Sequence, residues 1–162
     1  MSRFHREDRG ALALLTVLLL PLILVTVVGV LELGAVRMVA ERGRIAADLA
    51  TVTAVNDQDE SELARSGTLR PSDDADRVAR EHFALNLAPL KGWLAATPEA
   101  IAAAADVAVS QRAGAVDPRT GRAYVGPTIR LWAELPVSTP FFAALLARPI
   151  TVVHVLSASS AR

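Results

Sequence analysis

The stretch LLLPLILVTVVGVLELG, Leu18–Gly34, contains one threonine and no charged side chain until it reaches Glu32. The uncharged run extends back to Ala11, so 21 residues, 11–31, carry no charge. As an α-helix this run measures roughly 31 Å, close to the hydrocarbon thickness of a bilayer. It is longer than the roughly 7–15 apolar residues of a signal peptide, and no A-x-A cleavage site follows it. The stretch predicts a retained membrane anchor, with a cleaved leader as the alternative.

Pro21 lies in the middle of this span and lacks a backbone donor. Transmembrane helices tolerate such a proline, and the hydroxyls of Thr16 and Thr26 can bond to helix carbonyls. We expect a mild kink there, with a functional hinge as the alternative. Arginines are equally numerous just before and just after the span, so their count does not orient the chain. Because most of the chain follows the span, we expect residues 1–10 to be a cytoplasmic tail, 11–31 the transmembrane helix and the remainder extracytoplasmic.

The helical pattern continues beyond the span as a stalk over residues 32–55. Arg37 with Glu41 and Arg44 with Asp48 supply ion pairs at spacing four. An apolar stripe, called the stalk stripe below, recurs among alanines and charges at Leu31, Met38, Ile45, Leu49 and Val52. A helix of this length needs something to pack against. The sequence leaves open whether the stripe contacts its own domain or neighbouring subunits.

Composition limits what the rest of the chain can be. With 162 residues, the chain has room for one small domain after the stalk, residues 56–162, called the outer domain below. The 17 basic and 17 acidic residues balance, which gives no basic face for nucleic acid. Because the chain has no cysteine, disulfides and thiolate metal sites are excluded.

The sequence predicts helices in the first part of the outer domain. The polar segment 56–62 is expected to be a solvated loop, and it resembles a calcium loop only superficially. Helix-start chemistry at Pro71–Asp73 predicts a helix over 73–87. Its apolar face and the residues after it comprise Ala79, Phe83, Leu87 and Leu90. Thr97, followed by proline and glutamate, predicts a further helix of about two turns.

In the second part of the outer domain, apolar residues recur at every second position. Alternation over 107–109, 129–135 and 150–158 predicts three strands. The segment DPRTG, 117–121, supplies a turn between the first two, and 138–146 reads as a short helix between the last two. We therefore expect an α+β fold in which a small antiparallel sheet is covered by helices.

Motifs for catalysis are missing from the sequence. His5, His82 and His154 have no metal-ligand spacing, and neither G-x-S-x-G nor S-x-x-K occurs. We therefore expect no catalytic, metal or cofactor site, and the chain is not expected to be an enzyme. Trp93 and Trp132 are expected to pack over the sheet, or alternatively to anchor at a membrane interface or on a partner.

The segment RGALALLTVLLLPLILVTVVGVLELGAVRMVAERGRIAADLATVTA resembles the N-terminal signature of TadE/TadG-like proteins of Flp (tight adherence) pilus assembly. The closing segments TPFFAALLA and SASSA are similar as well. The resemblance covers the first 54 residues well and the last 35 loosely. The signature positions are Arg9, Gly10, Pro21, Glu32, Gly34, Ala46, Ala47 and Asp48.

The resemblance implies a pilin-like, non-catalytic component of a pilus or secretion assembly, anchored in the cell membrane. Its expected partners are the lipid bilayer and other subunits, including further copies of this chain. Pilin-type precursors are cut after a glycine that glutamate follows five residues later, but here Leu15 is the fifth residue after Gly10. We therefore expect no cleavage at Gly10, which favours the TadG-like side. The alternatives are a signal-anchored envelope enzyme and a secreted binding domain with a cleaved leader.

Overall fold

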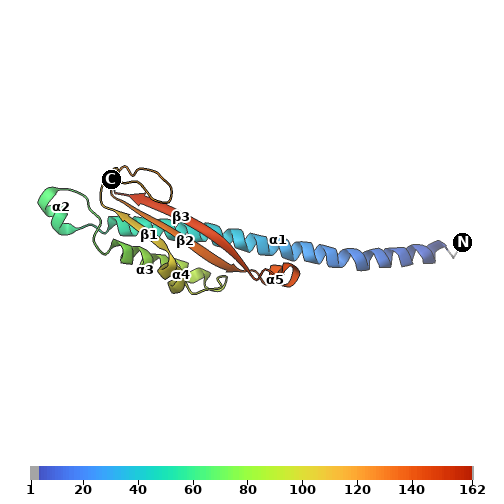
Figure 1. Ribbon diagram of the computed structural model, residues 1–162. Helices are drawn as coiled ribbons and strands as arrows, with labels where there is room; N and C mark the ends of the chain where they lie inside the picture. The colour runs from blue at the N-terminus through green and yellow to red at the C-terminus, as the bar shows by residue number, and fades with distance from the viewer. Residues whose placement is uncertain (1–3, 162) are drawn as a thin grey trace.

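A computed structural model describes the backbone of residues 4–161 and the side chains of residues 14–161. Helix α1, Phe4–Asn56, is one continuous helix of 53 residues. Its N-terminal half extends away from the rest of the molecule, and its C-terminal half packs on the outer domain (Figure 1). The predicted end of the helix, near Val55, is correct to one residue. The signature positions Arg9 and Gly10 lie outside the residues whose side chains are described.

The outer domain contains the predicted antiparallel sheet. Strands β1 (Asp106–Ser110), β2 (Thr128–Ser138) and β3 (Ile150–Ser160) lie in the order β1-β2-β3. Long β2 pairs with β3 over its whole length, from Thr128 opposite Ser160 to Ser138 opposite Ile150. The α+β class and the three strands are therefore confirmed.

Helices cover one face of this sheet. The second half of α1 lies beside α3 (Ala75–Leu87), and α4 (Pro98–Ala104) follows after the short 3-10 helix η1 (Ala88–Leu90). The stripe predicted for α3 and η1 is buried completely, since none of its four side chains is more than 1% exposed. From the sheet, the core is built by Ile129, Leu131, Ala133, Leu135, Val137 and Val155. The alternating residues of β2 point to the other face of the sheet.

The contact face of α1 consists mainly of small residues, with Val39 and Val55 buried at its two ends. Ala46, Ala47 and Ala50 are buried against the sheet and α3. At Gly43 the approach is so close that an added Cβ would overlap the Cδ1 methyl group of Leu135. Further along, the hydroxyl of Thr51 forms 2.9 Å hydrogen bonds with hydroxyls of β3. Because these side chains are short, α1 lies almost directly on the strands.

The loop predicted at 56–62 is partly wrong. Residues Glu60–Ser66 form helix α2, whose N-cap is Asp59. The Asp59 carboxylate accepts hydrogen bonds from the backbone N–H groups of Ser61 and Glu62 at 3.0 and 3.1 Å. Gly67 ends the helix with a φ of 68°. The acidic residues that resembled a loop therefore include a helix cap and a first turn, which favours acids because of the helix dipole.

Two short helices occur as predicted. Helix α4 begins after Thr97, whose hydroxyl accepts a hydrogen bond from the N–H of Ala100 at 3.2 Å. Its C-terminal carbonyls are satisfied from α3, because Nη1 of Arg80 donates to the carbonyls of Ala102, Ala103 and Ala105 at 2.7–3.0 Å. Helix α5, Pro140–Leu146, connects β2 to β3 and ends at Ala147, which has a φ of 54°.

Candidate functional site

The first half of α1 has the properties of a membrane span. Within the described residues, one helix is long and apolar enough to cross a membrane, and none of its apolar window is buried in the protein. All described side chains from Leu14 to Val28 are exposed. The helix continues through Pro21 without a break. Within the apolar run, the hydroxyl of Thr26 donates to the carbonyl of Leu22 at 2.8 Å, so this polar group is satisfied inside the helix.

The stalk stripe is found mainly on the face of α1 that the sheet does not cover. Ile45, Leu49 and Val52 are 48, 52 and 46% exposed, and Leu31 is 67% exposed. Met38 differs, because it is partly buried and packs against the core. The stripe therefore leaves about half of each branched side chain in solvent, and Ile45 and Leu49 border a groove that they share with Leu90 of the domain. The domain packs mainly on Val39 and the alanines of α1.

The stalk charges do not form the ion pairs that their spacing predicted. Among the described residues, neither Arg37 with Glu41 nor Arg44 with Asp48 comes within salt-bridge distance. In both cases the basic residue precedes the acidic one. That order is the less favourable one at spacing four, because it opposes the helix dipole.

Glu32, at the end of the apolar run, binds α5. Its Oε1 accepts a hydrogen bond from the N–H of Phe141, and its Oε2 accepts one from the N–H of Phe142, both at 2.8 Å. These N–H groups belong to the first turn of α5 and have no acceptor within that helix. One carboxylate therefore satisfies two helix donors and ties α5 to α1 at the point where the apolar run ends.

The other signature positions have different environments. Ala46 and Ala47 are at most 2% exposed and form part of the contact with the domain. Gly34 is exposed, and a Cβ added there would meet no atom of the described residues within 4 Å. Asp48 is half-buried. The small size of Ala46 and Ala47 is needed for the packing of α1, whereas that of Gly34 is not.

The face of the sheet opposite the helices carries a cluster of charged groups. Arg130 on β2 is 2% exposed, and its Nε lies 3.1 Å from Oδ1 of the equally buried Asp117 in the loop between β1 and β2. Nη2 of Arg130 also donates to Oδ2 of Asp106 at 3.0 Å. The guanidinium of Arg119 lies 3.7 Å from the ring centroid of Trp132. These contacts hold the loop over the sheet.

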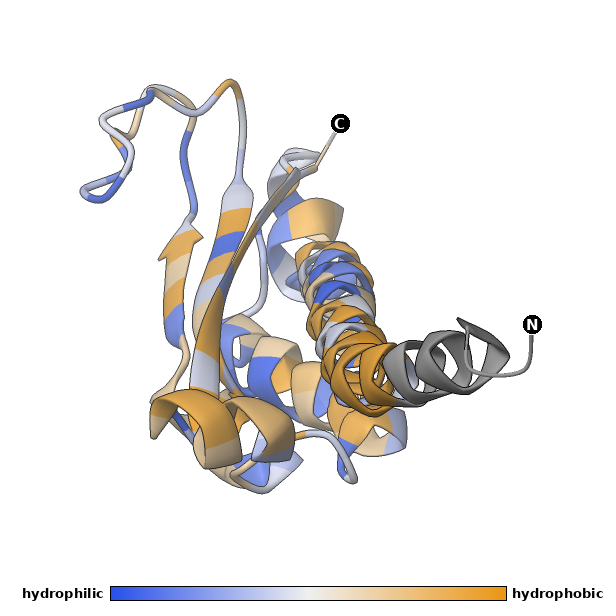
Figure 2. Ribbon diagram, turned by 90° about the vertical axis from the view of Figure 1, so that its right-hand side faces the viewer, coloured by the Kyte–Doolittle hydropathy of each residue, from blue (hydrophilic) through white to orange (hydrophobic). Residues whose placement is uncertain are grey.

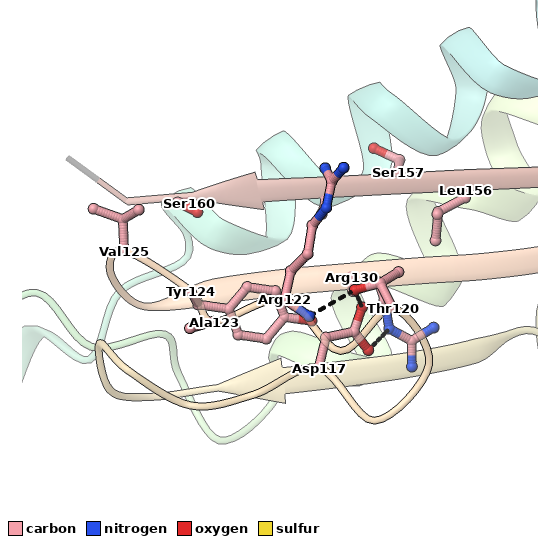
Figure 3. A pocket seen from close by; sticks show the side chains of 11 residues that line it. Asp117, Thr120, Arg122, Ala123, Tyr124, Val125, Arg130, Leu156, Ser157 and Ser160 are labelled. Atoms are coloured by element: carbon pink, nitrogen blue, oxygen red, sulfur yellow. Dashed lines mark hydrogen bonds and ion pairs between the residues drawn. The ribbon is translucent and has the colours of Figure 1, made fainter.

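A surface pocket lies beside this cluster, between the loop and β3 (Figure 3). Asp117 is on one side of it, and burial alone would raise the pKa of this carboxyl. Hydrogen bonds from the Thr120 hydroxyl and the Arg119 N–H, together with the charge of Arg130, outweigh burial and lower the pKa below its ordinary value. In the described part of the chain, no group of three His, Asp or Glu side chains could hold a metal ion. The charges of Arg130 and Asp117 are paired, which is typical of a structural ion pair, although Nε and Nη1 of Arg130 and the hydroxyl of Tyr124 have no hydrogen-bond partner among the described residues.

Comparison with protein-family models, curated proteins and solved structures found no match. The resemblance to TadE/TadG-like proteins therefore stays a prediction from the sequence. What the chain can do must be inferred from its own geometry, namely the exposed span, the stalk stripe and the contact of Glu32 with α5.

Sequence reasoning missed two contacts of this site, that of Glu32 with α5 and that of Asp117 with Arg130, for the same reason. Glu32 and Phe141 are separated by 109 residues, and neither carries a local signal of the other. The Asp117–Arg130 pair likewise joins a turn to a strand. The available hints were an acid at the end of an apolar run and a strand arginine at an alternating position, and neither identifies a partner.

Proposed function

We propose that this protein is a membrane-anchored, pilin-like component of a Tad/Flp-type pilus or secretion assembly. Residues 11–31 span the cell membrane, the N-terminus is cytoplasmic and the α+β domain is extracytoplasmic. Its activity is protein binding through the stalk helix rather than catalysis. Its partners are other subunits of the assembly, including further copies of this chain.

The observation that carries this proposal is the exposed stalk stripe. Ile45, Leu49 and Val52 project from the same helix that supports the domain, yet about half of each remains in solvent. Burying an apolar side chain of this size completely contributes about 1.5–3 kcal/mol, so the exposed halves retain about 1 kcal/mol each for a partner. A surface helix that needed only to support its own domain would carry polar residues at these positions.

The composition of α1 supports the same mechanism. Val39 and the alanines are used within the subunit, which leaves the exposed halves of Ile45, Leu49 and Val52 for contacts between subunits. The two faces belong to one continuous helix, so a subunit held by its span presents the stripe at a fixed height above the bilayer. Helix-to-helix packing in a bundle of such subunits would bury it.

The test uses the absence of cysteine from the chain. Ile45→Cys and Leu49→Cys variants are crosslinked in native membranes with a short bis-maleimide. Arg44→Cys is the matched control, because this exposed neighbour lies about 100° around the helix from Ile45. We expect crosslinked species at Ile45 and Leu49 but not at Arg44. Equal crosslinking at all three positions, or none at any, would contradict the proposal.

A second pair of variants separates assembly from folding. Ile45→Glu places a charge in the exposed stripe, whereas Ala46→Glu places one at an adjacent position that is 2% exposed. We expect Ile45→Glu to abolish crosslinking through Leu49→Cys while the domain stays resistant to protease. Ala46→Glu should make the domain protease-sensitive. Protease sensitivity of Ile45→Glu would show that this residue is part of the subunit's own core.

A further inference from the structure

The end of the outer domain nearest the span carries a group of apolar side chains that the fold does not cover. Helix α5 lies beside α1 there (Figures 1 and 2), held by the two hydrogen bonds to Glu32. All seven residues of α5 are described, and none is buried. Leu145 and Leu146 are 56 and 59% exposed. In the turn after η1, Trp93 is 46% exposed and lines the same groove as Leu31 and Phe141.

The depth of α5 relative to the span follows from its contacts with α1. A Cβ added at Gly29 would lie 3.3 Å from Cε1 of Phe141, so this ring touches the span. Gly29 precedes the end of the apolar run, Leu31, by two residues, or about 3 Å along the helix. A side chain in contact with Gly29 therefore lies at the hydrocarbon edge. The rest of α5 must then lie in the interfacial layer of the bilayer.

We propose that α5 and Trp93 form an interfacial seat, by which the outer domain rests in the headgroup and upper acyl layer of the membrane. The proposal rests on the membrane anchoring proposed above, and it adds a second membrane contact made by the domain itself. The occupant of this apolar surface is lipid, because the surface is continuous with the exposed span.

The chemistry around the seat fits this layer. Tryptophan prefers the membrane interface, where its ring is apolar and its N–H remains solvated. Lys91 and Arg148 are exposed and flank the two parts of the seat, so their cations can reach lipid phosphates. Glu32 would be costly at the hydrocarbon edge if its carboxylate lacked partners. The two N–H groups of α5 supply these partners, which makes the position of this acid compatible with the interface.

The experiment measures depth at single positions in the full chain. Cysteines replace Leu145, Leu146, Leu85 or Leu24, one at a time, and carry an environment-sensitive fluorophore. The protein is placed in nanodiscs at one copy per disc, with nitroxide-labelled lipids that quench either near the headgroups or deep in the acyl layer. Leu85, on α3, is the matched control because it is 67% exposed and lies on the domain. Leu24 reports on the span.

We expect probes at Leu145 and Leu146 to be quenched by the shallow nitroxide and to emit at shorter wavelength than the probe at Leu85. The probe at Leu24 should be quenched by the deep nitroxide, and the probe at Leu85 by neither. If Leu145 and Leu146 behave like Leu85 while Leu24 is quenched, the span is in the membrane but α5 is not, and the proposed seat is refuted. If Leu24 is not quenched, the anchoring fails and the seat fails with it.

Discussion

Replacing Gly43 by alanine tests how closely α1 lies on the sheet. A glycine inside a helix is destabilising by about 1 kcal/mol relative to alanine, so propensity alone would make Gly43→Ala stabilising. Here the new Cβ would overlap Cδ1 of Leu135 and lie 3.5 Å from Cγ1 of Val155. Leu135 is fully buried and cannot move its methyl group into solvent. Such overpacking costs about 1–3 kcal/mol.

The two effects together predict that Gly43→Ala lowers the free energy of unfolding by about 0–2 kcal/mol. For a chain of this size about 1 kcal/mol lowers the melting temperature by about 2–4 °C. Gly34→Ala is the matched control, because Gly34 lies in the same helix with no described atom near its added Cβ. Gly34→Ala should therefore raise the free energy of unfolding by about 1 kcal/mol, the full difference in helix propensity between glycine and alanine.

A double-mutant cycle isolates the contact. Leu135→Val removes the Cδ1 methyl group that the new Cβ would overlap. In that background Gly43→Ala should become stabilising by about 1 kcal/mol, so its effect changes sign. The measurement is thermal unfolding of the detergent-solubilised full chain, followed by circular dichroism. If Gly43→Ala stabilises the parent protein as much as Gly34→Ala does, the close approach of α1 to β2 is incorrect.

Three further predictions concern polar contacts. Glu32→Gln removes a charged acceptor for two N–H groups, which should cost about 1.5–3 kcal/mol and speed amide exchange at Phe141 and Phe142; unchanged exchange would contradict the capping role. Asp117 has a lowered pKa in the folded state, so its stabilisation is complete above its unfolded value of 3.8 and is lost as pH falls below it. Asp117→Asn should therefore lower the melting temperature at pH 7, and its difference in melting temperature from wild type should shrink at acidic pH. A difference that stays the same at acidic pH would argue against this role. Arg80→Ala should cost about 1–3 kcal/mol, because the carbonyls of the last turn and C-cap of α4 lose a partly buried charged donor. Arg77→Ala removes only exposed ion pairs and should have less effect on the same thermal unfolding curve; equal effects would refute the distinction.

The elements of the fold could be read from local patterns. The apolar run, the N-cap at Thr97 and the alternation over 129–135 are signals within a few residues. Helix α4 begins directly after Thr97 and β2 lies close to its predicted bounds, whereas α1 begins at Phe4, before the predicted start at Ala11. Helix α2 was missed because acids favour a helix start as well as a loop. Asp59 could have been recognised as an N-cap from the serine and glutamates that follow it.

The faces of the elements were harder to predict. For α1 the apolar pattern left open whether the stalk stripe contacts the domain or other subunits. It gave no sign that the sheet would contact Ala46, Ala47 and Ala50. Small residues allow the helix to approach the strands more closely, and a periodicity weighted by hydrophobicity does not detect that preference. On β3 the larger residues Ile150, Val152 and Leu156 are likewise about half exposed. Contacts over a long sequence distance, such as that of Glu32 with Phe141, carry no local pattern at all.

The continuity of α1 from the span into the domain sets both a height and an angle. Gly43, which contacts the sheet, lies 11 residues after Glu32, which binds α5. One residue inserted between these two contacts would raise the sheet by about 1.5 Å and turn it by about 100° around the helix axis. About seven residues would nearly restore the angle but would separate the two contacts by about 10 Å. The segment therefore fixes both the distance and the rotation between the two contacts, so its length can vary less than that of a flexible linker.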